Sequence, residues 1–558
     1  PMQFRWNHTQ GAPDYDRETG FGFVTGAVYT ADAGLHIPET NSGFLPLWWY
    51  AGTPISDIRQ SEYGLQATAA EALRTEDAAD RRLPVWLRIQ VPGEGVYRAE
   101  ITVTGTDGGE VLVFTGRRRL AWRGVLPAGA QQIVTAYCDV FPIVPRGQAD
   151  AVASDAVNIA VVGGALSAVA LAEAPHTRRI WVCGDSTVTD QTGELPYAPG
   201  TSYAGWGQML PAYLPEVCIT NHAHSGLTTE SFLSEGHWAI VKPRLRAGDI
   251  CLFQFGHNDQ KLAHLQARGG YTDRLRTYIK ETRTAGAVPV LITPLARNSW
   301  RDPTHYNDFL ADFADAVLDL GKEEAVPVLD LHAYAMQLIR QEGLETAKRW
   351  FYPGDYTHTN DFGAYRMAGF VAGALGTAAG LPVADAPAWT PAPPFAPLTP
   401  PKDCTLPSPG TDPFADYDAT RPQEVLTRAE ALELAIKALK LFPINVYNDL
   451  YADIVGHETY AGTVQCAAQN DLIPAAWVAD GNLYPQRTVT AADFLAVLMP
   501  GAAGRRPLAA PSPLPDTVPA YARFAAGQAM AEQLISADNL NDPITRSDAA
   551  AFCRRLHI

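Results

Sequence analysis

Five short apolar segments recur in the middle of the chain, separated by stretches long enough for helices. They occupy residues 180–183, 217–220, 250–255, 288–293 and 326–331. Nearly continuous apolar strands that alternate with helices are typical of a parallel sheet covered by helices on both faces. We therefore predict an α/β domain over residues 176–382. We expect its ligands to bind beyond the carboxyl ends of the strands.

The chain before this domain has short alternating strands separated by glycine-rich and proline-rich turns. Residues 96–103 alternate apolar and polar side chains, residues 104–109 form a turn signal, and 110–114 and 132–137 continue the pattern. This pattern predicts an antiparallel β-sandwich with a jelly-roll-like fold over residues 1–175. This region also contains an aromatic cluster of Trp48, Trp49 and Tyr50. The cluster either fills the core of the sandwich or a domain interface, or it stacks on sugar rings.

The chain after the α/β domain divides into a proline-rich stretch and a helical one. Prolines crowd residues 383–423, which we interpret as a semi-extended linker. Residues 424–558 then contain three helix starts, in which a capping threonine is followed by an acid three residues later. These threonines are Thr427, Thr490 and Thr545. Such an internal repeat predicts an all-α region of stacked units that share one core.

Composition restricts the partners that the protein can have. A chain of 558 residues is too long for one core, which agrees with the three predicted domains. The formal net charge of −17 argues against nucleic acid or an anionic membrane as partner, because either would be repelled. The 7 cysteines are scattered without a C-x-x-C spacing, which argues against a disulfide framework and a zinc site.

Four sequence blocks contain candidate catalytic residues. They are Gly-Asp-Ser-Thr-Val at 184–188, Asn-His-Ala-His-Ser-Gly at 221–226, Phe-Gly-His-Asn-Asp at 255–259 and Asp-Tyr-Thr-His at 355–358. A serine hydroxyl becomes a nucleophile when a histidine accepts its proton and a carboxylate orients that histidine. We therefore expect Ser186 as nucleophile, His358 as base and Asp355 as its partner. Asp355 and His358 are expected to share one face of a helical turn.

The same blocks offer hydrogen-bond donors for an oxyanion. We expect the backbone N–H groups of Ser186 and Gly226 and the side-chain amide of Asn258 to fill this role. Glycine at position 226 allows a close backbone approach. Three neighbouring histidines either contact a sugar substrate or have a local structural role: His222, His224 and His257.

These blocks resemble those of the SGNH hydrolase superfamily, in its branch of rhamnogalacturonan acetylesterase-like carbohydrate esterases. Thr293-Pro294 followed by Arg297, and Asn360-x-x-Gly363-Ala364 after the last block, add to the resemblance. It covers about residues 176–380 and implies a flavodoxin-like three-layer fold, the site residues named above and no metal or other cofactor.

The activity implied by this resemblance is removal of acetyl groups from acetylated plant cell-wall polysaccharides or oligosaccharides. The substrate could then be xylan, mannan or pectin, including rhamnogalacturonan. The alternatives are a lipase or thioesterase of the same superfamily, and a wall-anchored binding protein with an inactive catalytic domain.

The C-terminal repeats resemble S-layer homology modules, which implies binding to cell-wall polysaccharide through an arginine after the capping threonine. Arg428 and Arg546 match this pattern, whereas Ala491 stands at the middle position. Residues 424–558 therefore either bind cell wall, pack against the catalytic domain or build a homo-oligomer. The start of the chain lacks a signal-peptide pattern, which with unpaired cysteines favours the cytoplasm. The S-layer resemblance favours the cell surface.

Overall fold

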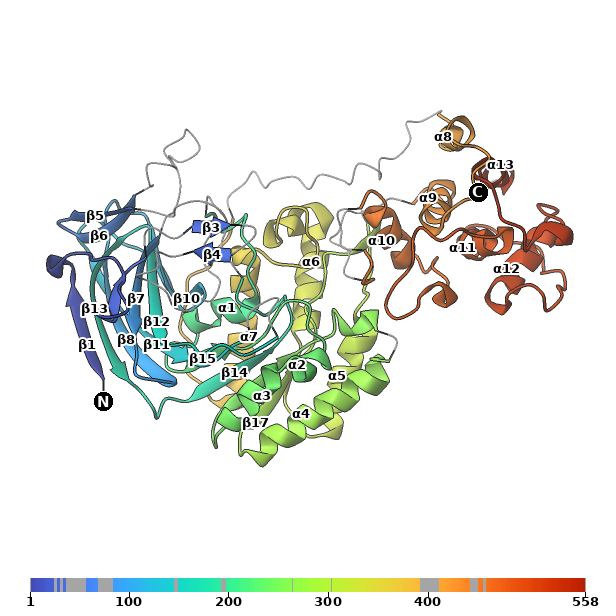
Figure 1. Ribbon diagram of the computed structural model, residues 1–558. Coiled ribbons are helices and arrows are strands. Elements are labelled where there is room, and N and C mark those ends of the chain that lie inside the picture. Colours follow the sequence, from blue (N-terminus) through green and yellow to red (C-terminus); the bar gives the residue numbers. More distant parts are fainter. Residues whose placement is uncertain are drawn as a thin grey trace.

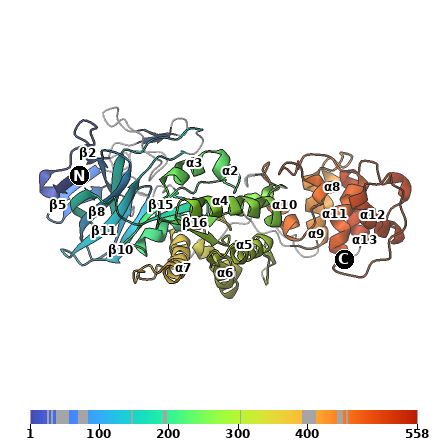
Figure 2. The same cartoon turned by 90° about the horizontal axis from the view of Figure 1, so that it is seen from below.

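The structure is a computed structural model. It describes residues 2–24, 28–30, 34–36, 57–68, 84–144, 149–191, 197–262, 264–302, 304–391, 411–441, 450–454 and 458–556. Antiparallel sheets, an α/β region and a helical region follow one another in a row (Figure 1 and Figure 2). The aromatic cluster at 48–50 and Cys404 lie outside the described residues.

The first region contains two large antiparallel sheets. One has the strand order β11-β8-β13-β6-β5, with β1 paired to β13, and the other has the order β10-β9-β12-β7-β2. Apolar residues that alternate along the strands, such as Ile101 and Val113, form a common core. The strand bounds are β1 Gln3–Asn7, β2 Phe21–Phe23, β3 Val28–Thr30, β4 Gly34–His36, β5 Asp57–Ser61, β6 Gly64–Thr68, β7 Pro84–Gln90, β8 Gly95–Thr104, β9 Glu110–Thr115, β10 Arg119–Val125, β11 Gln131–Val140, β12 Ala156–Val162 and β13 Ala165–Glu173.

Strands β8, β9 and β11 contain the segments expected to be strands at 96–103, 110–114 and 132–137. In β8 and β11 about every second side chain is buried, as the alternating sequence predicts, whereas β9 is buried at five consecutive residues. The jelly-roll-like connectivity stays a prediction.

The central region is a parallel sheet of five strands in the order β15-β14-β16-β17-β20. In chain order this is the 2-1-3-4-5 arrangement of flavodoxin-like folds. The five apolar segments predicted from the sequence all contribute strands, within a few residues of the expected ends. The bounds are β14 Arg179–Gly184, β15 Cys218–Asn221, β16 Ile250–Gln254, β17 Val288–Ile292 and β20 Val328–Leu329.

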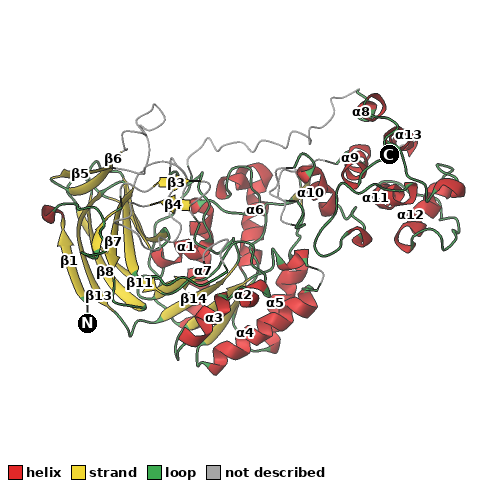
Figure 3. Cartoon of the chain, viewed as in Figure 1, coloured by secondary structure: helices red, strands yellow, loops and turns green. Residues whose placement is uncertain are grey.

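Helices cover both faces of this sheet, as Figure 3 shows. Along β14, Ile180 and Val182 join a core that includes Trp206, whereas Trp181 and Cys183 join a second core that includes Trp238. The first face carries α1 Trp206–Met209, α6 Leu331–Ala347 and α7 Asp361–Ala379, and the second carries α2 Ser231–Ser234, α3 His237–Val241, α4 Thr272–Thr284 and α5 Ala311–Glu323. The three-layer arrangement expected for residues 176–382 is therefore present.

One antiparallel sheet packs directly on the α/β region. Trp86 of β7, Phe114 of β9 and Leu120 of β10 belong to the same buried core as Ile180 of the parallel sheet. Neighbouring residues of the same strands, such as Val113, face the core between the two antiparallel sheets. The sheet β10-β9-β12-β7-β2 is thus covered on both faces, which joins the first two regions through a continuous apolar contact.

The C-terminal region is helical in its described residues, with one core of its own. The N–H of Leu426 donates to the carbonyl of Ile544, the N–H of Ile544 to that of Val489, and the N–H of Val489 to that of Leu426. This closed ring joins equivalent positions of the three repeats around a common centre. The bounds are α8 Ala415–Ala419, α9 Arg428–Ala438, α10 Ala461–Gln469, α11 Ala491–Ala503, α12 Ala520–Ala531 and α13 Arg546–Leu556.

The linker predicted over residues 383–423 is shorter than expected, because aromatic side chains anchor both of its ends. Trp389 is buried in the core of the α/β region, and the N–H of Ala384 donates to the carbonyl of Tyr213. At the other end, Phe414 and Tyr417 are buried in the helical core. The helical region therefore begins before the predicted boundary at residue 424.

Two further findings concern the described residues only. None of their helices is both long and apolar enough to cross a bilayer. Their six cysteines are buried free thiols, three of which lie inside strands β14, β15 and β16: Cys183, Cys218 and Cys251.

Candidate active site

Three side chains from two distant segments lie in series at the end of β14. The Oγ atom of Ser186 lies 2.7 Å from Nε2 of His358, and Nδ1 of the same ring lies 2.9 Å from Oδ2 of Asp355. Ser186 stands in the turn that follows the strand, where parallel sheets place their ligands. The Asp355 side chain is 1% exposed and that of His358 is 20% exposed. The imidazole therefore connects a buried carboxylate with a hydroxyl near the surface.

The loop that carries Asp355 and His358 differs from the expected helical turn. Residues 356–358 form a bend, and Oδ1 of Asp355 accepts hydrogen bonds from the backbone N–H groups of Thr357 at 2.8 Å and His358 at 2.9 Å. Aspartate often closes a turn in this way, because its short side chain reaches the backbone two or three residues on. The aspartate thus shapes the loop with one oxygen and meets the imidazole with the other.

The sequence analysis did not identify two tyrosines at the site, of which one meets the imidazole and the other stacks on the first. The Tyr203 ring meets the His358 ring edge-on, with centroids 5.9 Å apart, and stacks on Tyr352 at 3.7 Å. The Tyr203 hydroxyl also lies 3.4 Å from Oδ2 of Asp355. Neither tyrosine belongs to a recognisable sequence block, and only the fold places Tyr203 beside a residue so distant in sequence.

Hydrogen bonds join the first three sequence blocks around Ser186. The N–H of His224 donates to the carbonyl of Gly184 at 3.1 Å, which ties the second block to the first. The Nδ2 atom of Asn258 donates to the carbonyl of Leu227 at 3.0 Å, and Nζ of Lys261 donates to Oδ1 of the same amide at 2.9 Å. The amide of Asn258 is therefore held in one orientation beside the residue that follows Gly226.

The two backbone donors expected for an oxyanion are open. In the described part of the chain, the N–H groups of Ser186 and Gly226 donate to no other protein atom. Gly226 has a φ of +81°, a left-handed conformation that favours glycine, and its surroundings leave open space. These groups can therefore donate to a ligand.

The three histidines near these donors lie in different environments. His222 is 4% exposed, packs on Trp181 and lies 3.0 Å from Oγ1 of Thr220, and burial lowers its pKa to about 3. His257 is 1% exposed, with Nε2 2.8 Å from the carbonyl of Leu295. Both rings are buried, which favours a local structural role over contact with a sugar for His222 and His257. His224 is partly exposed.

A buried polar layer supports the turns that carry the site. The Oδ1 atom of Asp259 accepts from the N–H of Thr229 at 2.9 Å and from its hydroxyl at 2.6 Å, and burial raises the pKa of Asp259 to about 7. Asp185 is buried too, but His257 and hydrogen bonds from Thr187 outweigh burial and lower the pKa of Asp185. The third block is thereby bonded to the segment that follows the second block and paired with the first block.

Within the described residues, no cluster of three or more histidine, cysteine, aspartate or glutamate side chains is arranged to hold a metal ion.

Comparisons with known proteins place this site in a family. Residues 182–366 match the GDSL-like lipase/acylhydrolase family. The chain is 33% identical over 222 residues to the rhamnogalacturonan acetylesterase RhgT of Bacillus subtilis (strain 168), covering 37% of this chain and 93% of that protein. It is 33% identical over 202 residues to the probable rhamnogalacturonan acetylesterase YesY of the same strain, covering 35% and 90%.

A third relative matches a longer part of the chain. The uncharacterized esterase YxiM of Bacillus subtilis (strain 168) is 25% identical over 368 residues, covering 63% of this chain and 82% of that protein. The three-layer fold and these matches define a protein of the GDSL-like lipase/acylhydrolase class, with rhamnogalacturonan acetylesterases among its relatives. The chain belongs to the GDSL-like lipase/acylhydrolase family, that of the SGNH hydrolases.

Proposed function

We propose that the protein is a serine esterase that removes O-acetyl groups from acetylated plant cell-wall polysaccharides or oligosaccharides. The observation that carries this proposal is the series of contacts from Ser186 through His358 to Asp355. Membership of an acylhydrolase family supports ester hydrolysis, and the names of two relatives support an acetylated pectin fragment as substrate.

The first half of the reaction transfers the acetyl group to the enzyme. The Oγ atom of Ser186 attacks the carbonyl carbon of the ester while its proton passes to Nε2 of His358. Asp355 stabilises the imidazolium that forms. The bond between the carbonyl carbon and the sugar oxygen then breaks, and that oxygen takes the proton from His358 as the sugar leaves.

The second half regenerates the enzyme. His358 takes a proton from a water molecule, whose oxygen attacks the acetyl carbon. The bond to Ser186 breaks, Oγ recovers its proton from His358, and acetic acid leaves, which ionises to acetate by giving its remaining proton to water. In both halves the developing oxyanion accepts hydrogen bonds from the open N–H groups of Ser186 and Gly226 and from the amide of Asn258.

Acetate release from defined substrates tests this proposal. Acetylated rhamnogalacturonan, xylan and mannan oligosaccharides are incubated with the wild-type protein and with Ser186→Ala, and the products are followed by mass spectrometry. Ser234→Ala is the matched control, because Ser234 is an exposed serine at the end of α2. We expect release by the wild type and the control only. Equal release by Ser186→Ala would remove the nucleophile assignment.

A general short-chain lipase or thioesterase of the same family is the second enzymatic candidate. Comparing acetyl with octanoyl esters and with thioesters on one leaving group separates it from the first. Faster turnover of the octanoyl ester or of the thioester would favour this second candidate.

The contacts of two arginines argue against a wall-binding role for residues 424–558. Arg428 donates to the carbonyls of Trp477 at 2.7 Å and Leu483 at 2.6 Å. Arg546 donates to the carbonyl of Thr420 at 3.0 Å and pairs with Glu430. Both guanidinium groups thus hold the helical region itself together. Sedimentation with purified cell walls, alongside the acetate assay, tests the alternative of a wall-anchored protein with an inactive catalytic domain.

A further inference from the structure

Three consecutive arginines of the antiparallel sheets are buried against the α/β region. Arg117 and Arg118 lie in the turn between β9 and β10, and Arg119 begins β10. The side chains of Arg117, Arg118 and Arg119 are 11%, 1% and 8% exposed. Burying a guanidinium costs free energy unless it is paired. The partners of these arginines therefore explain why the turn can be buried between the antiparallel sheets and the α/β region.

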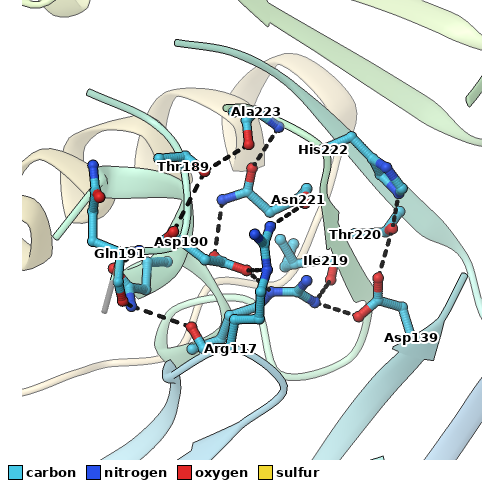
Figure 4. A network of polar contacts seen from close by, with 12 residues as sticks. Arg117, Asp139, Thr189, Asp190, Gln191, Ile219, Thr220, Asn221, His222 and Ala223 are labelled. Carbon is cyan, nitrogen blue, oxygen red and sulfur yellow. Dashed lines mark hydrogen bonds and ion pairs between the residues drawn. The ribbon is translucent and has the colours of Figure 1, made fainter. Parts of the chain in front are cut away.

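Arg119 and Arg117 bond to the segments that carry the first two sequence blocks. Nε of Arg119 donates to Oδ2 of Asp190 at 2.8 Å, and Nε of Arg117 lies 3.4 Å from the same oxygen. The other oxygen of Asp190 accepts from Nδ2 of Asn221 at 3.0 Å. Figure 4 shows how this network joins the turn after Ser186 to the end of β15.

Arg118 bonds to the segments around the candidate base. Its Nη1 donates to Oδ2 of Asp361 at 2.6 Å, and its Nη2 donates to the carbonyl of Tyr203. The hydroxyl of Tyr197 donates to the same oxygen of Asp361, and the Arg118 guanidinium lies 5.4 Å from the centre of the Tyr197 ring. One guanidinium therefore links two stretches of the α/β region, 197–203 and the start of α7.

These two stretches hold the His358 loop in place. The N–H of Ala204 donates to the carbonyl of Thr359 at 3.1 Å, and Tyr203 forms a bridge with Asn360. Tyr203 is thus fixed on one side by Arg118, while its ring lies against the imidazole of His358 and its hydroxyl faces Asp355. Tyr203 thus connects the arginine directly with the candidate base, and Asp361 lies three positions after that base in the sequence.

We propose that Arg118 is a positioning residue for the esterase site, acting through Tyr203 and Asp361 on the loop of His358. This inference rests on the proposed function. The antiparallel sheets then supply part of the support of the active site, and the α/β region depends on them for its full activity.

The experiment compares three variants of the full chain. Arg118→Met removes the hydrogen bonds to Asp361 and Tyr203 while keeping an unbranched side chain of roughly similar length. Arg118→Lys keeps a positive charge near Asp361, but an ammonium lacks the planar fork that meets Asp361 and Tyr203 together. Arg88→Met is the matched control, because Arg88 is buried at 1% exposure, pairs with Asp155 at 2.9 Å and lies within the antiparallel sheets.

Each variant is measured for kcat and KM on an acetyl ester, for the rate at which a fluorophosphonate labels Ser186, and for its melting temperature. We expect Arg118→Met to lower kcat and the labelling rate by roughly tenfold to a hundredfold, because small displacements of catalytic groups are costly. KM should stay within about twofold, because Arg118 does not reach the substrate. Arg118→Lys should recover part of the loss. Arg88→Met should lower the melting temperature alone.

Wild-type kcat and labelling in folded Arg118→Met, or equal losses in Arg118→Met and Arg88→Met, would overturn the inference. If Arg118→Met fails to fold, the test rests on Arg118→Lys. An Arg118→Lys variant with wild-type kcat and a wild-type labelling rate would then overturn the inference. Failure of the proposed function looks different. In that case the wild type and Ser186→Ala would show the same hydrolysis and the same labelling.

Discussion

The Nδ1 atom of His358 lies 2.9 Å from Oδ2 of Asp355, while Oδ1 of that carboxylate accepts hydrogen bonds from two backbone N–H groups. Since a carboxylate oxygen only accepts, it favours the tautomer that carries its proton on Nδ1. The unprotonated Nε2 then faces Ser186, 2.7 Å from its hydroxyl. The geometry of the loop thus determines which nitrogen is available as a base.

The variant Asp355→Asn should lose most of the activity while keeping the fold. The amide keeps an oxygen for the backbone N–H groups, but its NH2 group meets Nδ1 and favours the wrong tautomer. We expect kcat to fall on the order of ten-thousandfold, as such a change does in serine hydrolases. The control is Asp308→Asn, because Asp308 faces a different histidine, His332, at 2.6 Å. Loss of less than about tenfold in Asp355→Asn would contradict this role.

The variant Asn258→Ala tests the oxyanion donor. Loss of one such donor costs about a hundredfold to a thousandfold in kcat. Lys261→Met should cost less, roughly tenfold, because it removes only the charge-assisted hydrogen bond that orients the amide. Steady-state kinetics on an acetyl ester measures both. An Asn258→Ala variant with wild-type kcat would show that the amide does not touch the oxyanion.

Acid should destabilise the protein partly through His222. Burial, with the positive charges of Arg119, Arg117 and His237, lowers the pKa of this histidine to about 3 from 6.5, although Asp139 opposes the shift. Since the unfolded chain binds a proton below pH 6.5 and the native ring does not, this contribution to stability is present above pH 6.5. It is lost as the pH falls towards 3, by at most about 1.4 kcal/mol per pH unit.

Urea unfolding at pH 7 and pH 5 measures this effect. The variant His222→Asn should lose less stability than the wild type between the two pH values, because asparagine does not titrate. The same loss in both proteins would show that His222 is charged in the native state or that its proton does not affect unfolding.

The threonine caps should stabilise the C-terminal region without affecting catalysis. Oγ1 of Thr490 accepts from the N–H of Asp493 at 3.2 Å, and the Asp493 carboxylate accepts from the N–H of Thr490 at 2.9 Å. Thr490→Ala should cost about 1 kcal/mol of helix stability. Thermal unfolding followed by circular dichroism measures it, with the exposed Thr517→Ala as control. A drop in kcat for Thr490→Ala at temperatures where it is folded would contradict the separation of these roles.

The local pattern of apolar residues was enough to predict those strands whose side chains are all buried. The strands of the parallel sheet are buried on both faces, so residues such as Trp181 and Val182 are apolar in succession. The serine, the histidine and the aspartate proposed from the sequence lie in series in the structure, and they could be proposed because nucleophilic catalysis restricts the residue types. The bend at 356–358 was not predicted, because a spacing of three residues fits both a helical turn and a bend that an aspartate side chain closes.

Contacts between distant segments could not be predicted from one sequence. Arginines 117–119 have the pattern of an exposed charged turn, and they are buried because carboxylates far along the chain meet them. Arg118 and Asp361 are separated by 243 positions. His222 likewise stands in a block that resembles a binding loop, and only the arrangement of β15 against Trp181 turns its ring into the interior.

Labelling with a fluorophosphonate, followed by peptide mapping, tests the central claim most directly. The reagent forms a covalent bond with a serine whose hydroxyl is activated by a neighbouring base. The account predicts one adduct, on the peptide that contains Ser186, and its loss in Ser186→Ala and in His358→Ala. An adduct on another residue, or labelling that persists in either variant, would contradict it.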